Sequence, residues 1–542
     1  MNAPIPQKLL LSGNEAVAEA ALDCGVTLGT GYPGTPSTDI LEHFAKIGGK
    51  AQWAPNEKVA MEVGLGVAFS KSRSLVTMKH VGVNVAADPL FTSAYTGVDG
   101  GMVIITADDP GMASSQNEQD NRRYAVAAGI PMLEPSNSQE AYEFTFKAFE
   151  ISEKWNIPVF LRMTTRICHA LTGVEKSVSI APPAKPGYEK NIQSRVMIPA
   201  FARPAHVKLR QKLADIEVFN DDSDLNTVTG TDSSFGIITS GVTFMHCREA
   251  MPDAKILKIG MCYPLPIQSI REFAKSVDRC MVIEEGDPYL VEAIRAAGIS
   301  VEGKAEMFRF GELNVKKVRK IIDGDTTEPP AIPRGKAPEL CAGCPHQTSF
   351  NVLNKLGCIV AGDIGCYTLG VLPPYSGMDT CICMGASIGI GLGLRHSLPR
   401  EQAIKVVSVI GDGTFAHSGM TGLMEMMYNR PEYGHLVIIL DNGTTAMTGM
   451  QESPTTGRAL DHSNAPQISL EGLVKACGVE YLDVIDPYYD QDRYEELIKE
   501  RLASEKTAVI IARRQCVISN KKIKAYEKEQ DSGCQEGGCD HE

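Results

Sequence analysis

The most constraining feature of this 542-residue chain is the segment 411–449, which reads GDGTFAHSGMTGLMEMMYNRPEYGHLVIILDNGTTAMTG. An apolar run at 406–410 precedes Gly-Asp-Gly, a helix-like stretch follows, and a second apolar run at 436–440 precedes Asp-Asn. The two apolar runs predict buried parallel strands joined by a crossover. Such strands bring their carboxyl ends together at the edge where an α/β sheet binds ligands.

Polar residues at these two strand ends predict a diphosphate site. Asp412 and Asn442 offer hard oxygen ligands to a Mg²⁺ that also holds a diphosphate. Gly411 and Gly413 let the backbone approach the phosphates closely. The pattern resembles the thiamine diphosphate signature, in which GDG and an Asn lie about thirty residues apart. That resemblance implies a third Mg²⁺ ligand, the backbone carbonyl of Thr444. An ordinary Asp-Gly turn is the alternative for a lone GDG, and the second strand with its Asp-Asn end argues against it.

Composition limits the class of protein. At 542 residues the chain should fold as about three or four domains. A hydrophobic fraction of 43% indicates a globular protein, and a net charge of −13 argues against a nucleic-acid partner. The sequence contains no run of about eighteen apolar residues, so no membrane span is predicted. The N-terminus lacks the apolar core of a secretory signal, so we expect a cytoplasmic location. Fifteen cysteines in such a chain then argue for metal, cluster or catalytic roles rather than disulfides.

The pattern along the chain predicts an α/β protein of the thiamine-diphosphate-binding fold, with two doubly wound parallel-sheet domains and a smaller α/β domain. Pro-rich or acidic joints separate strand-and-helix regions. The predicted divisions are a pyrimidine-binding domain at 1–176, a linker at 177–234, a transketolase C-terminal-like domain at 235–325, a diphosphate-binding domain at 335–520, and a loosely ordered tail at 521–542.

Thiamine chemistry also needs a carboxylic acid beside the aminopyrimidine ring. The segment NEKVAMEVGLGVAFSKSRSLVTMKHVG places Glu57 at the start of a helix-like run and Glu62 five residues later, on a different face. It resembles the E-x8-G-A helix of 2-oxoacid:ferredoxin oxidoreductases, and the register ending at Gly82 implies that Glu57 is the catalytic acid. Glu62 remains the alternative, and a solvated helix face is the simpler interpretation of either residue alone.

Two further motifs in the first domain are candidates for binding substrate. GYPGTPSTDI resembles the Y-P-x-T-P-S loop of the same oxidoreductases, which implies that Thr35 contacts the oxoacid. Lys79 and His80 follow a predicted strand in TMKH, where a cation could bind a substrate carboxylate. Structural hydrogen bonds are an equally good interpretation of these two residues.

Four cysteines predict the reaction class. Cys341 and Cys344 form a CxxC, Cys366 follows in GDIGCYTLG, and Cys516 comes just after a strand-like run. A CxxC alone is compatible with zinc or redox chemistry, but the four together could supply the thiolates of a [4Fe–4S] cluster. Pyruvate:ferredoxin oxidoreductases use a similar arrangement for the cluster nearest thiamine. The other cysteines of the domains, Cys381 and Cys383 among them, are interpreted as small core residues. For Cys534, Cys539 and His541 of the tail, metal scavenging or no function is expected.

With these residues in place, the chain resembles the α subunits of indolepyruvate ferredoxin oxidoreductases across about residues 8–520. Further similar segments include TMKHVGVNVAADPL, the polar loop DDPGMASSQNEQDNR at 108–122, CAGCPH and GDGTFAHSG. The resemblance implies oxidative decarboxylation of an aryl 2-oxoacid, such as indolepyruvate or phenylpyruvate, with coenzyme A. It also implies electron transfer to ferredoxin, a smaller β subunit and an α₂β₂ assembly. The family's usual C-terminal ferredoxin-like domain has no counterpart here, so electrons are expected to leave to another subunit or carrier.

Two other functions remain open on the sequence alone. A non-oxidative thiamine-dependent 2-oxoacid decarboxylase has the same order of domains, needs no cluster and releases an aldehyde. A catalytically silent subunit that only binds a partner is the second alternative, and the intact GDG, DN and Glu57 argue against it.

Overall fold

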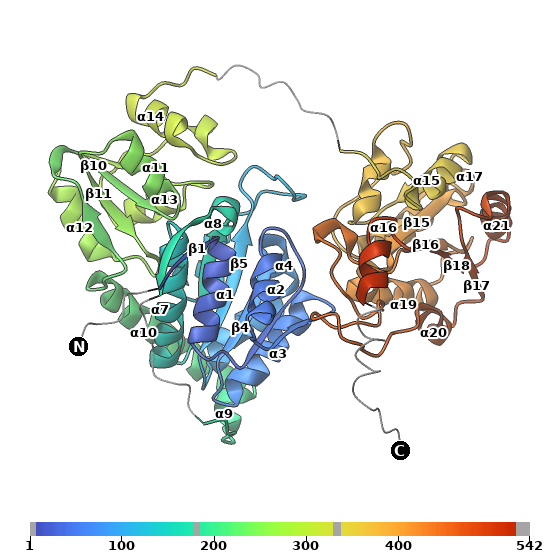
Figure 1. Ribbon diagram of the computed structural model, residues 1–542, viewed down its shortest axis with the longest axis horizontal. Coiled ribbons are helices and arrows are strands. Elements are labelled where there is room, and N and C mark those ends of the chain that lie inside the picture. The colour runs from blue at the N-terminus through green and yellow to red at the C-terminus, as the bar shows by residue number, and fades with distance from the viewer. Residues whose placement is uncertain (1–6, 177–184, 329–337, 527–542) are drawn as a thin grey trace. The chain divides into compact units, whose positions relative to one another are not determined.

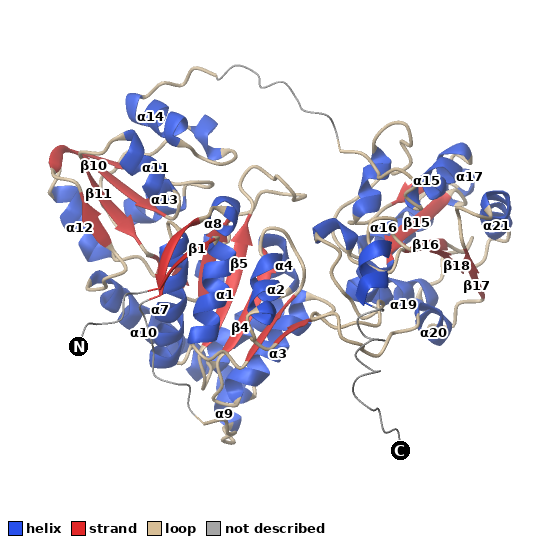
Figure 2. Cartoon of the chain, viewed as in Figure 1, coloured by secondary structure: helices blue, strands red, loops and turns tan. Residues whose placement is uncertain are grey.

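The computed structural model describes residues 7–176, 185–328 and 338–526. The chain divides into two compact units, Met1–Pro330 and Ala331–Glu542, which are described separately (Figure 1). Both are α/β, with helices packed around the strands of each sheet (Figure 2). The predicted fold class is confirmed.

Seven strands among the described residues form the main sheet of the first unit, in the order β12-β6-β7-β5-β4-β2-β3. All neighbours are parallel except β6 and β12. The central strands β4, β5 and β7 are buried along their whole lengths, as their continuous apolar runs predict for parallel strands covered on both faces. The strands are β2 (Leu28–Gly31), β3 (Ala51–Trp53), β4 (Ser74–Lys79), β5 (Met102–Asp108), β6 (Met132–Leu133), β7 (Val159–Thr164) and β12 (Met261–Tyr263).

Helices follow these strands. The N-terminal α1 begins with a capping box in which Ser12 and Glu15 satisfy each other's backbone N–H groups. An antiparallel pair, β1 (Gln7–Leu11) and β8 (Thr172–Lys176), lies apart from the main sheet. The helices are α1 (Gly13–Asp23), α2 (Thr38–Lys46), α3 (Glu57–Phe69), α4 (His80–Val85), α5 (Ala87–Thr96), α6 (Arg122–Ala128), α7 (Ser138–Trp155) and α8 (Thr165–His169).

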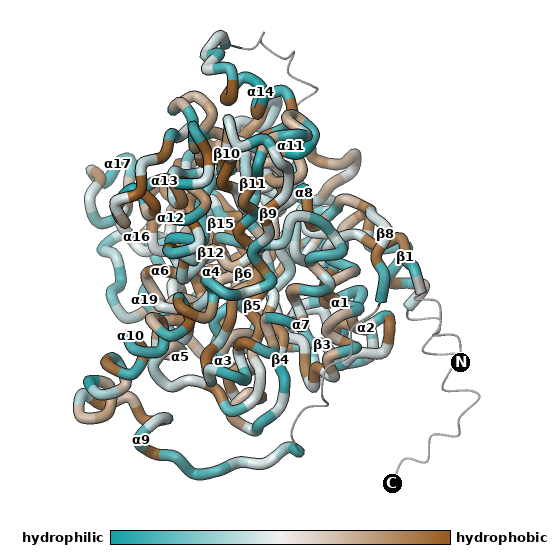
Figure 3. Tube along the Cα trace, turned by 90° about the vertical axis from the view of Figure 1, so that its left-hand side faces the viewer, coloured by the Kyte–Doolittle hydropathy of each residue, from teal (hydrophilic) through white to brown (hydrophobic). Residues whose placement is uncertain are grey.

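A smaller sheet of the first unit has the order β13-β10-β11-β9. Its strands are β9 (Thr227–Thr229), β10 (Asp232–Ser240), β11 (Ala254–Ile259) and β13 (Arg279–Val282), and its helices are α11 (Thr243–Ala250), α12 (Ile267–Lys275), α13 (Tyr289–Ala296) and α14 (Val315–Asp323). The amphipathic α14 alternates between apolar and charged residues (Figure 3) and buries Val318 and Ile321. The middle segment also contributes β12 to the edge of the larger sheet. That shared strand joins the two predicted domains in one compact unit.

The range 177–234, expected to be a linker, contains a long helix. α10 (Pro199–Asp221) packs on α5 and α12 and buries Leu209, Leu213 and Ile216. Pro204 is the sixth residue of this helix, and the helix continues through it although a proline there cannot donate to the carbonyl of Ala200. The i, i+4, i+7 spacing of the buried residues was the signal for a helix. The short α9 (Ile192–Arg195) precedes it.

The second unit has one sheet with every neighbouring pair parallel, in the order β14-β15-β16-β18-β17. Side chains of β16 alternate between two cores: Ile438 packs with α15 and α21, and Ile439 packs with α16, α19 and α20. Helices therefore cover both faces. The elements are α15 (His346–Lys355), β14 (Ile359–Ala361), α16 (Ala386–Ser397), α17 (Arg400–Ala403), β15 (Val406–Gly411), α18 (Asp412–Thr414), α19 (Met420–Tyr428), β16 (Leu436–Asp441), α20 (Leu470–Ala476), β17 (Tyr481–Ile485), α21 (Gln491–Ala503) and β18 (Ala508–Arg513).

Candidate active site

Four neighbouring strands of the second unit end at the residues that the sequence singled out. Cys366 follows β14, Asp412 follows β15, Asn442 follows β16 and Cys516 follows β18. These strands are parallel, so all four residues lie at the carboxyl edge of one sheet. This is the edge at which α/β sheets bind ligands.

Asp412 is a buried carboxylate at the start of α18. Burial raises its pKa to about 7, and the nearby Asp441 adds to the rise. Thr455 donates a hydrogen bond from Oγ1 to Asp412 Oδ2 at 3.1 Å. Asp441 is paired with Arg513 at 2.6 Å, so the cost that a bound cation would offset is mainly the desolvation of Asp412. The sequence did not predict the contribution of Thr455.

Asn442 and Thr444 belong to the turn after β16, the strand next to β15, which Asp412 follows. Both Asn442 and Thr444 are buried, and Asn442 Oδ1 accepts a hydrogen bond from the backbone N–H of Thr444 at 3.1 Å. The amide Nδ2 of Asn442 lies 3.4 Å from Nε2 of His346. Burial lowers the pKa of His346 to about 4, so its imidazole is neutral and can accept this hydrogen bond. The histidine after the CxxC thus orients the amide and leaves its oxygen available for a metal ion.

Both glycines of GDG lie close to neighbouring side chains, so a larger residue would not fit at Gly411 and would be tight at Gly413. A Cβ on Gly411 would lie 2.8 Å from Cε1 of Tyr367, and one on Gly413 would lie 3.2 Å from Oγ1 of Thr445. That hydroxyl is buried and has no hydrogen-bond partner among the described residues. An unsatisfied buried hydroxyl beside a glycine backbone fits an anionic ligand such as a diphosphate.

The four predicted cysteines lie near one another. Burial raises the pKa of the Cys344 thiol to about 11, and Cys341, Cys516 and Cys366 each raise it further. The pKa of Cys366 is likewise raised to about 11, by burial first and then by Cys516 and Cys341. The CxxC loop turns at Gly343, whose φ is +74°, and a Cβ there would lie 4.0 Å from Val517. Four thiols that interact across three chain segments fit a [4Fe–4S] cluster as donors.

Within the described ranges, no three His, Cys, Asp or Glu side chains surround a point that could hold a single metal ion. Neither the predicted Mg²⁺ ligands nor the four predicted cluster cysteines would form such a single-ion site from these four residue types. The Mg²⁺ set combines the carboxylate of Asp412 with the amide oxygen of Asn442 and the carbonyl of Thr444, and oxygen donors suit this hard cation. A [4Fe–4S] cluster would take one thiolate on each of four irons, which is a different arrangement from a single-ion site.

The candidates of the first unit also lie at one sheet edge. The loop with Thr35 follows β2, and Glu57 follows β3. Lys79 is the last residue of β4 and His80 comes directly after it, while the loop 108–122 begins at the end of β5. In the sheet, β3 lies on one side of β2, whereas β4 and then β5 lie on its other side, so the order of the strands reverses at β2. Such a reversal opens a crevice at the carboxyl ends of β2 and β4, where doubly wound sheets bind ligands.

The two candidate glutamates differ in burial. Glu57, the first residue of α3, is buried beside Gly82, where a Cβ would lie only 2.6 Å from Glu57 Oε1. Glu62 is exposed and forms an ion pair with Lys58. Of the two glutamates, only Glu57 is therefore enclosed by the protein.

Lys79 and His80 hold the loop 108–122. Lys79 donates from Nζ to the carbonyl of Ser114 at 2.6 Å, and burial lowers its pKa while Asp109 opposes that shift. His80 Nε2 lies 3.1 Å from both oxygens of Asn117. Nδ1 of His80 is buried and has no partner in the described part of the chain. The structural hydrogen bonds considered for these residues are present, and one imidazole nitrogen remains available.

The loop that carries Thr35 packs against Lys79. Thr35 is half-buried, and a Cβ on its neighbour Gly34 would lie 3.0 Å from Lys79 Cβ. The loop is held by Thr38, whose Oγ1 accepts from the N–H of Gly34 at 2.9 Å. The structure therefore brings the Thr35 loop next to Lys79 at the carboxyl edge of the sheet.

Sequence reasoning missed a buried ion network behind the loop 108–122. Arg122 lies 2.9 Å from Glu284 of the middle segment and donates to Asp120, and these three side chains are at most 4% exposed. Arg162 pairs with Asp108 at 2.8 Å. The only sequence signal was the charged end of DDPGMASSQNEQDNR, because Glu284, the second carboxylate partner of Arg122, lies 162 residues away.

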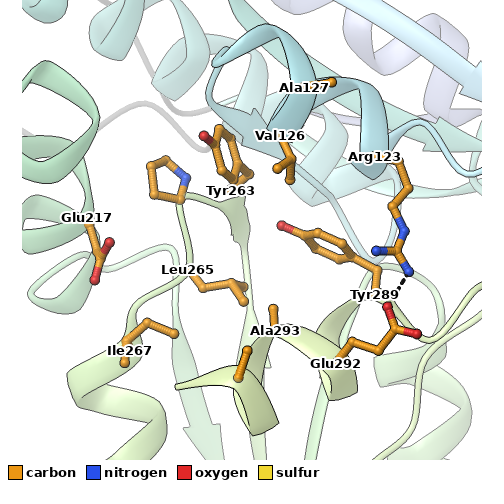
Figure 4. A pocket seen from close by; sticks show the side chains of 12 residues that line it. Arg123, Val126, Ala127, Glu217, Tyr263, Leu265, Ile267, Tyr289, Glu292 and Ala293 are labelled. Carbon is orange, nitrogen blue, oxygen red and sulfur yellow. Dashed lines mark hydrogen bonds and ion pairs between the residues drawn. The ribbon is translucent and has the colours of Figure 1, made fainter. Parts of the chain in front are cut away.

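The first unit also contains a pocket of about 530 Å³ between α6, α13 and the segment after β12. Figure 4 shows its aromatic and aliphatic lining, with Tyr263 and Leu265 pointing inward and the Arg123–Glu292 ion pair at one side. None of the residues predicted for the site lines this pocket.

Exposure of the remaining cysteines corrects one prediction. Cys24, Cys168, Cys247, Cys262 and Cys280 are buried, as expected for small core residues. In contrast, Cys383 is exposed and Cys381 is half-buried, because the segment before α16 lies at the surface. The tail residues Cys534, Cys539 and His541 lie outside the described residues.

Comparisons with known proteins match this geometry. A family model for "pyruvate flavodoxin/ferredoxin oxidoreductase, thiamine diP-bdg" matches residues 19–208. A model for the C-terminal TPP-binding domain of thiamine pyrophosphate enzymes matches 363–512. Indolepyruvate oxidoreductase subunit IorA of Methanothermobacter thermautotrophicus is 40% identical over 96% of this chain and 88% of its own length. The same subunit of Thermococcus kodakarensis is 36% identical over 94% and 86%.

A solved structure of 2-oxoglutarate:ferredoxin oxidoreductase from Magnetococcus marinus shares the fold. Its TM-score is 0.51 at 17% identity, and the match covers 59% of this chain and 65% of that chain. No helix in the described ranges is both long and apolar enough to cross a membrane.

Proposed function

This chain belongs to the family of indolepyruvate ferredoxin oxidoreductase IorA subunits, and from that premise we propose that it carries out oxidative decarboxylation of an aryl 2-oxoacid. One 2-oxoacid and one coenzyme A yield one arylacetyl-CoA, one CO₂, one proton and two electrons. The names of the relatives support an indolepyruvate-type substrate, and the thiamine diphosphate models support the cofactor. When bound, thiamine diphosphate supplies the electron sink for decarboxylation.

We assign the diphosphate end of the cofactor to the second unit. Asp412, Asn442 and the carbonyl of Thr444 would hold Mg²⁺, and Gly411 and Gly413 would admit the phosphates. The burial of Asp412 beside Asp441 and the unsatisfied Thr445 hydroxyl support this assignment. Each feature is a free-energy cost that a bound cation and anion would offset.

The first unit would supply the acid and the oxoacid contacts. Glu57 would hold a proton against the aminopyrimidine ring, and its burial beside Gly82 supports that role over Glu62. Thr35 and His80 would orient the oxoacid, supported by their common position at the crevice of the sheet and by the unpartnered Nδ1 of His80.

One observation carries the oxidative assignment. The backbone N–H of Cys516 donates to the carbonyl of Asn442 at 3.0 Å, so a predicted cluster ligand is bonded directly to a predicted Mg²⁺ ligand. His346 makes the second link, since it follows the CxxC and lies 3.4 Å from the Asn442 amide. A cluster held by Cys341, Cys344, Cys366 and Cys516 would therefore sit beside the cofactor and take its electrons singly.

We further propose a smaller β subunit as partner, an α₂β₂ assembly, and ferredoxin or another one-electron carrier as acceptor. The word "subunit" in the names of the relatives supports a multi-subunit enzyme.

The products test the proposal. The chain and its partner subunit are incubated without oxygen with indolepyruvate, coenzyme A and methyl viologen, and the products are measured by mass spectrometry. Indoleacetyl-CoA with two viologens reduced per turnover is expected. Indoleacetaldehyde as the main product, with viologen left oxidised, would instead identify a non-oxidative decarboxylase.

A further inference from the structure

We propose that the surface beside Cys516 docks an acidic protein that carries one electron. This lysine surface consists of Val517, Ile518, Lys521, Lys522 and Lys524. The inference rests on the proposed function, since a carrier would dock here in turnover only if the neighbouring cysteines hold a cluster.

Charge is the first argument. The chain has a net charge of −13, yet residues 513–524 contain two arginines, three lysines and no acidic residue. The two arginines are neutralised: Arg513 lies 2.6 Å from Asp441, and Arg514 lies 2.9 Å from Asp486. Lys521, Lys522 and Lys524 are exposed and form no ion pair with any residue that the structure describes. The lysine surface therefore carries positive charge on a chain whose net charge is negative.

Its position is the second argument. Val517 and Ile518 directly follow Cys516 and are 38% and 53% exposed. Val517 also lies beside the CxxC loop, 4.0 Å from where a Cβ on Gly343 would lie, and Cys341 in that loop is exposed. The apolar pair is thus exposed next to Cys516, with Val517 beside the CxxC loop. A small apolar centre with charged residues beside it is the usual composition of a weak redox interface.

The stoichiometry of electrons explains why such an interface must be weak. Each turnover releases two electrons, and a one-electron carrier takes one from the reduced cluster, leaves, and is replaced by a second oxidised carrier. Fast association without tight binding is what electrostatic attraction provides. An acidic carrier would also be repelled by the rest of this negative chain, which favours docking at the lysines.

The test uses the full chain with its partner subunit, a purified acidic ferredoxin and methyl viologen. A charge-reversal variant, Lys521→Glu/Lys522→Glu/Lys524→Glu, is compared with a control of equal charge change, Lys475→Glu/Lys499→Glu/Lys506→Glu. The control lysines are exposed residues of the same unit, and Lys506 lies just before β18, at the opposite edge of the sheet from Cys516. Ferredoxin binding is measured by biolayer interferometry and turnover by ferredoxin reduction, at low and high salt.

At low salt, charge reversal at the lysine surface should lower both ferredoxin affinity and kcat/KM for ferredoxin at least about tenfold. About 0.5 M salt should remove most of that difference, because such charges are screened. Reduction of methyl viologen should change less than about twofold, and the control should match wild type. Ferredoxin binding and kcat/KM that are equal in all three proteins overturn the docking proposal.

Two other outcomes also overturn the proposal. The sequence 527–542 contains six acidic residues and one lysine. If ferredoxin binds only after truncation at Tyr526, the chain's own acidic segment occupies the lysines. If charge reversal releases the partner subunit, the surface is a subunit contact. A wild-type enzyme that reduces neither acceptor but binds ferredoxin through these lysines would contradict the proposed function and leave the docking site standing.

Discussion

Arg122 neutralises the buried carboxylates behind the loop 108–122, and removing it should destabilise the first unit. Arg122 lies 2.9 Å from Glu284 and 2.5 Å from Asp120. Its guanidinium Nη2 also donates to the backbone carbonyls of Glu285 and Asp287. Replacement by Met keeps the apolar bulk but leaves two carboxylates buried without this partner. Breaking a buried ion pair in this way costs about 3–5 kcal/mol.

The cost should depend on pH. In the wild type, burial works to raise the pKa of Asp120, but Arg122 and Arg162 outweigh it and hold that pKa well below its ordinary range. Burial raises the pKa of Glu284, and Arg122 limits the rise. Without Arg122 both folded-state pKa values rise, so the folded state takes up protons as the pH falls. The deficit in unfolding free energy should therefore shrink between pH 7.5 and pH 5, by about 1.4 kcal/mol for each pKa unit gained and titrated.

Tryptophan fluorescence in urea measures this unit alone, because the two tryptophans of the chain, Trp53 and Trp155, both belong to it. Arg122→Met should lower the urea midpoint by about 1 M or more at pH 7.5. Arg122→Met/Glu284→Gln should recover part of the loss. Arg123→Met is the matched control, since its pair with Glu292 is exposed and worth less than about 1 kcal/mol. An Arg122→Met protein as stable as the control at both pH values would refute this account of the network.

Three further predictions concern the proposed site. Glu57→Gln should lower kcat at least about 100-fold with indolepyruvate, whereas Glu62→Gln should leave it within about twofold; equal rates in both variants would contradict the assignment of the acid. Thr455→Val removes the 3.1 Å hydrogen bond to Asp412 and should weaken thiamine diphosphate binding about 10–100-fold by calorimetry in the presence of Mg²⁺, so unchanged affinity would exclude this contribution. Cys344→Ala should remove the cluster's visible absorption, while Cys383→Ala should retain it. An unchanged visible spectrum in Cys344→Ala would contradict the assignment of Cys344 as a cluster ligand.

Local sequence patterns predicted the sheet edge well, because strand ends and turns are encoded by neighbouring residues. Val406–Gly411 and Leu436–Asp441 are parallel neighbours, and Asp412 and Asn442 follow them as expected. The gathering of the four predicted cysteines could be anticipated only through the family resemblance, since nothing in their spacing states which strands are adjacent.

Contacts between distant segments could not be predicted in this way. Thr455 reaches Asp412 from a loop 43 residues later, and no periodicity marks that contact. Arg122 meets Glu284 across two predicted domains. Proline content misled the assignment of α10, because the helix continues through Pro204. The spacing of the buried Leu209 and Leu213 was the better signal.

The central claim is that one chain holds a redox cluster next to a thiamine diphosphate site. Iron, acid-labile sulfide and an EPR spectrum after dithionite reduction, measured on protein purified without oxygen, test it most directly. The account predicts about four irons and four sulfides per chain with the signal of a reduced [4Fe–4S]⁺ cluster. Protein that retains thiamine diphosphate but contains no iron, although never exposed to air, would contradict it.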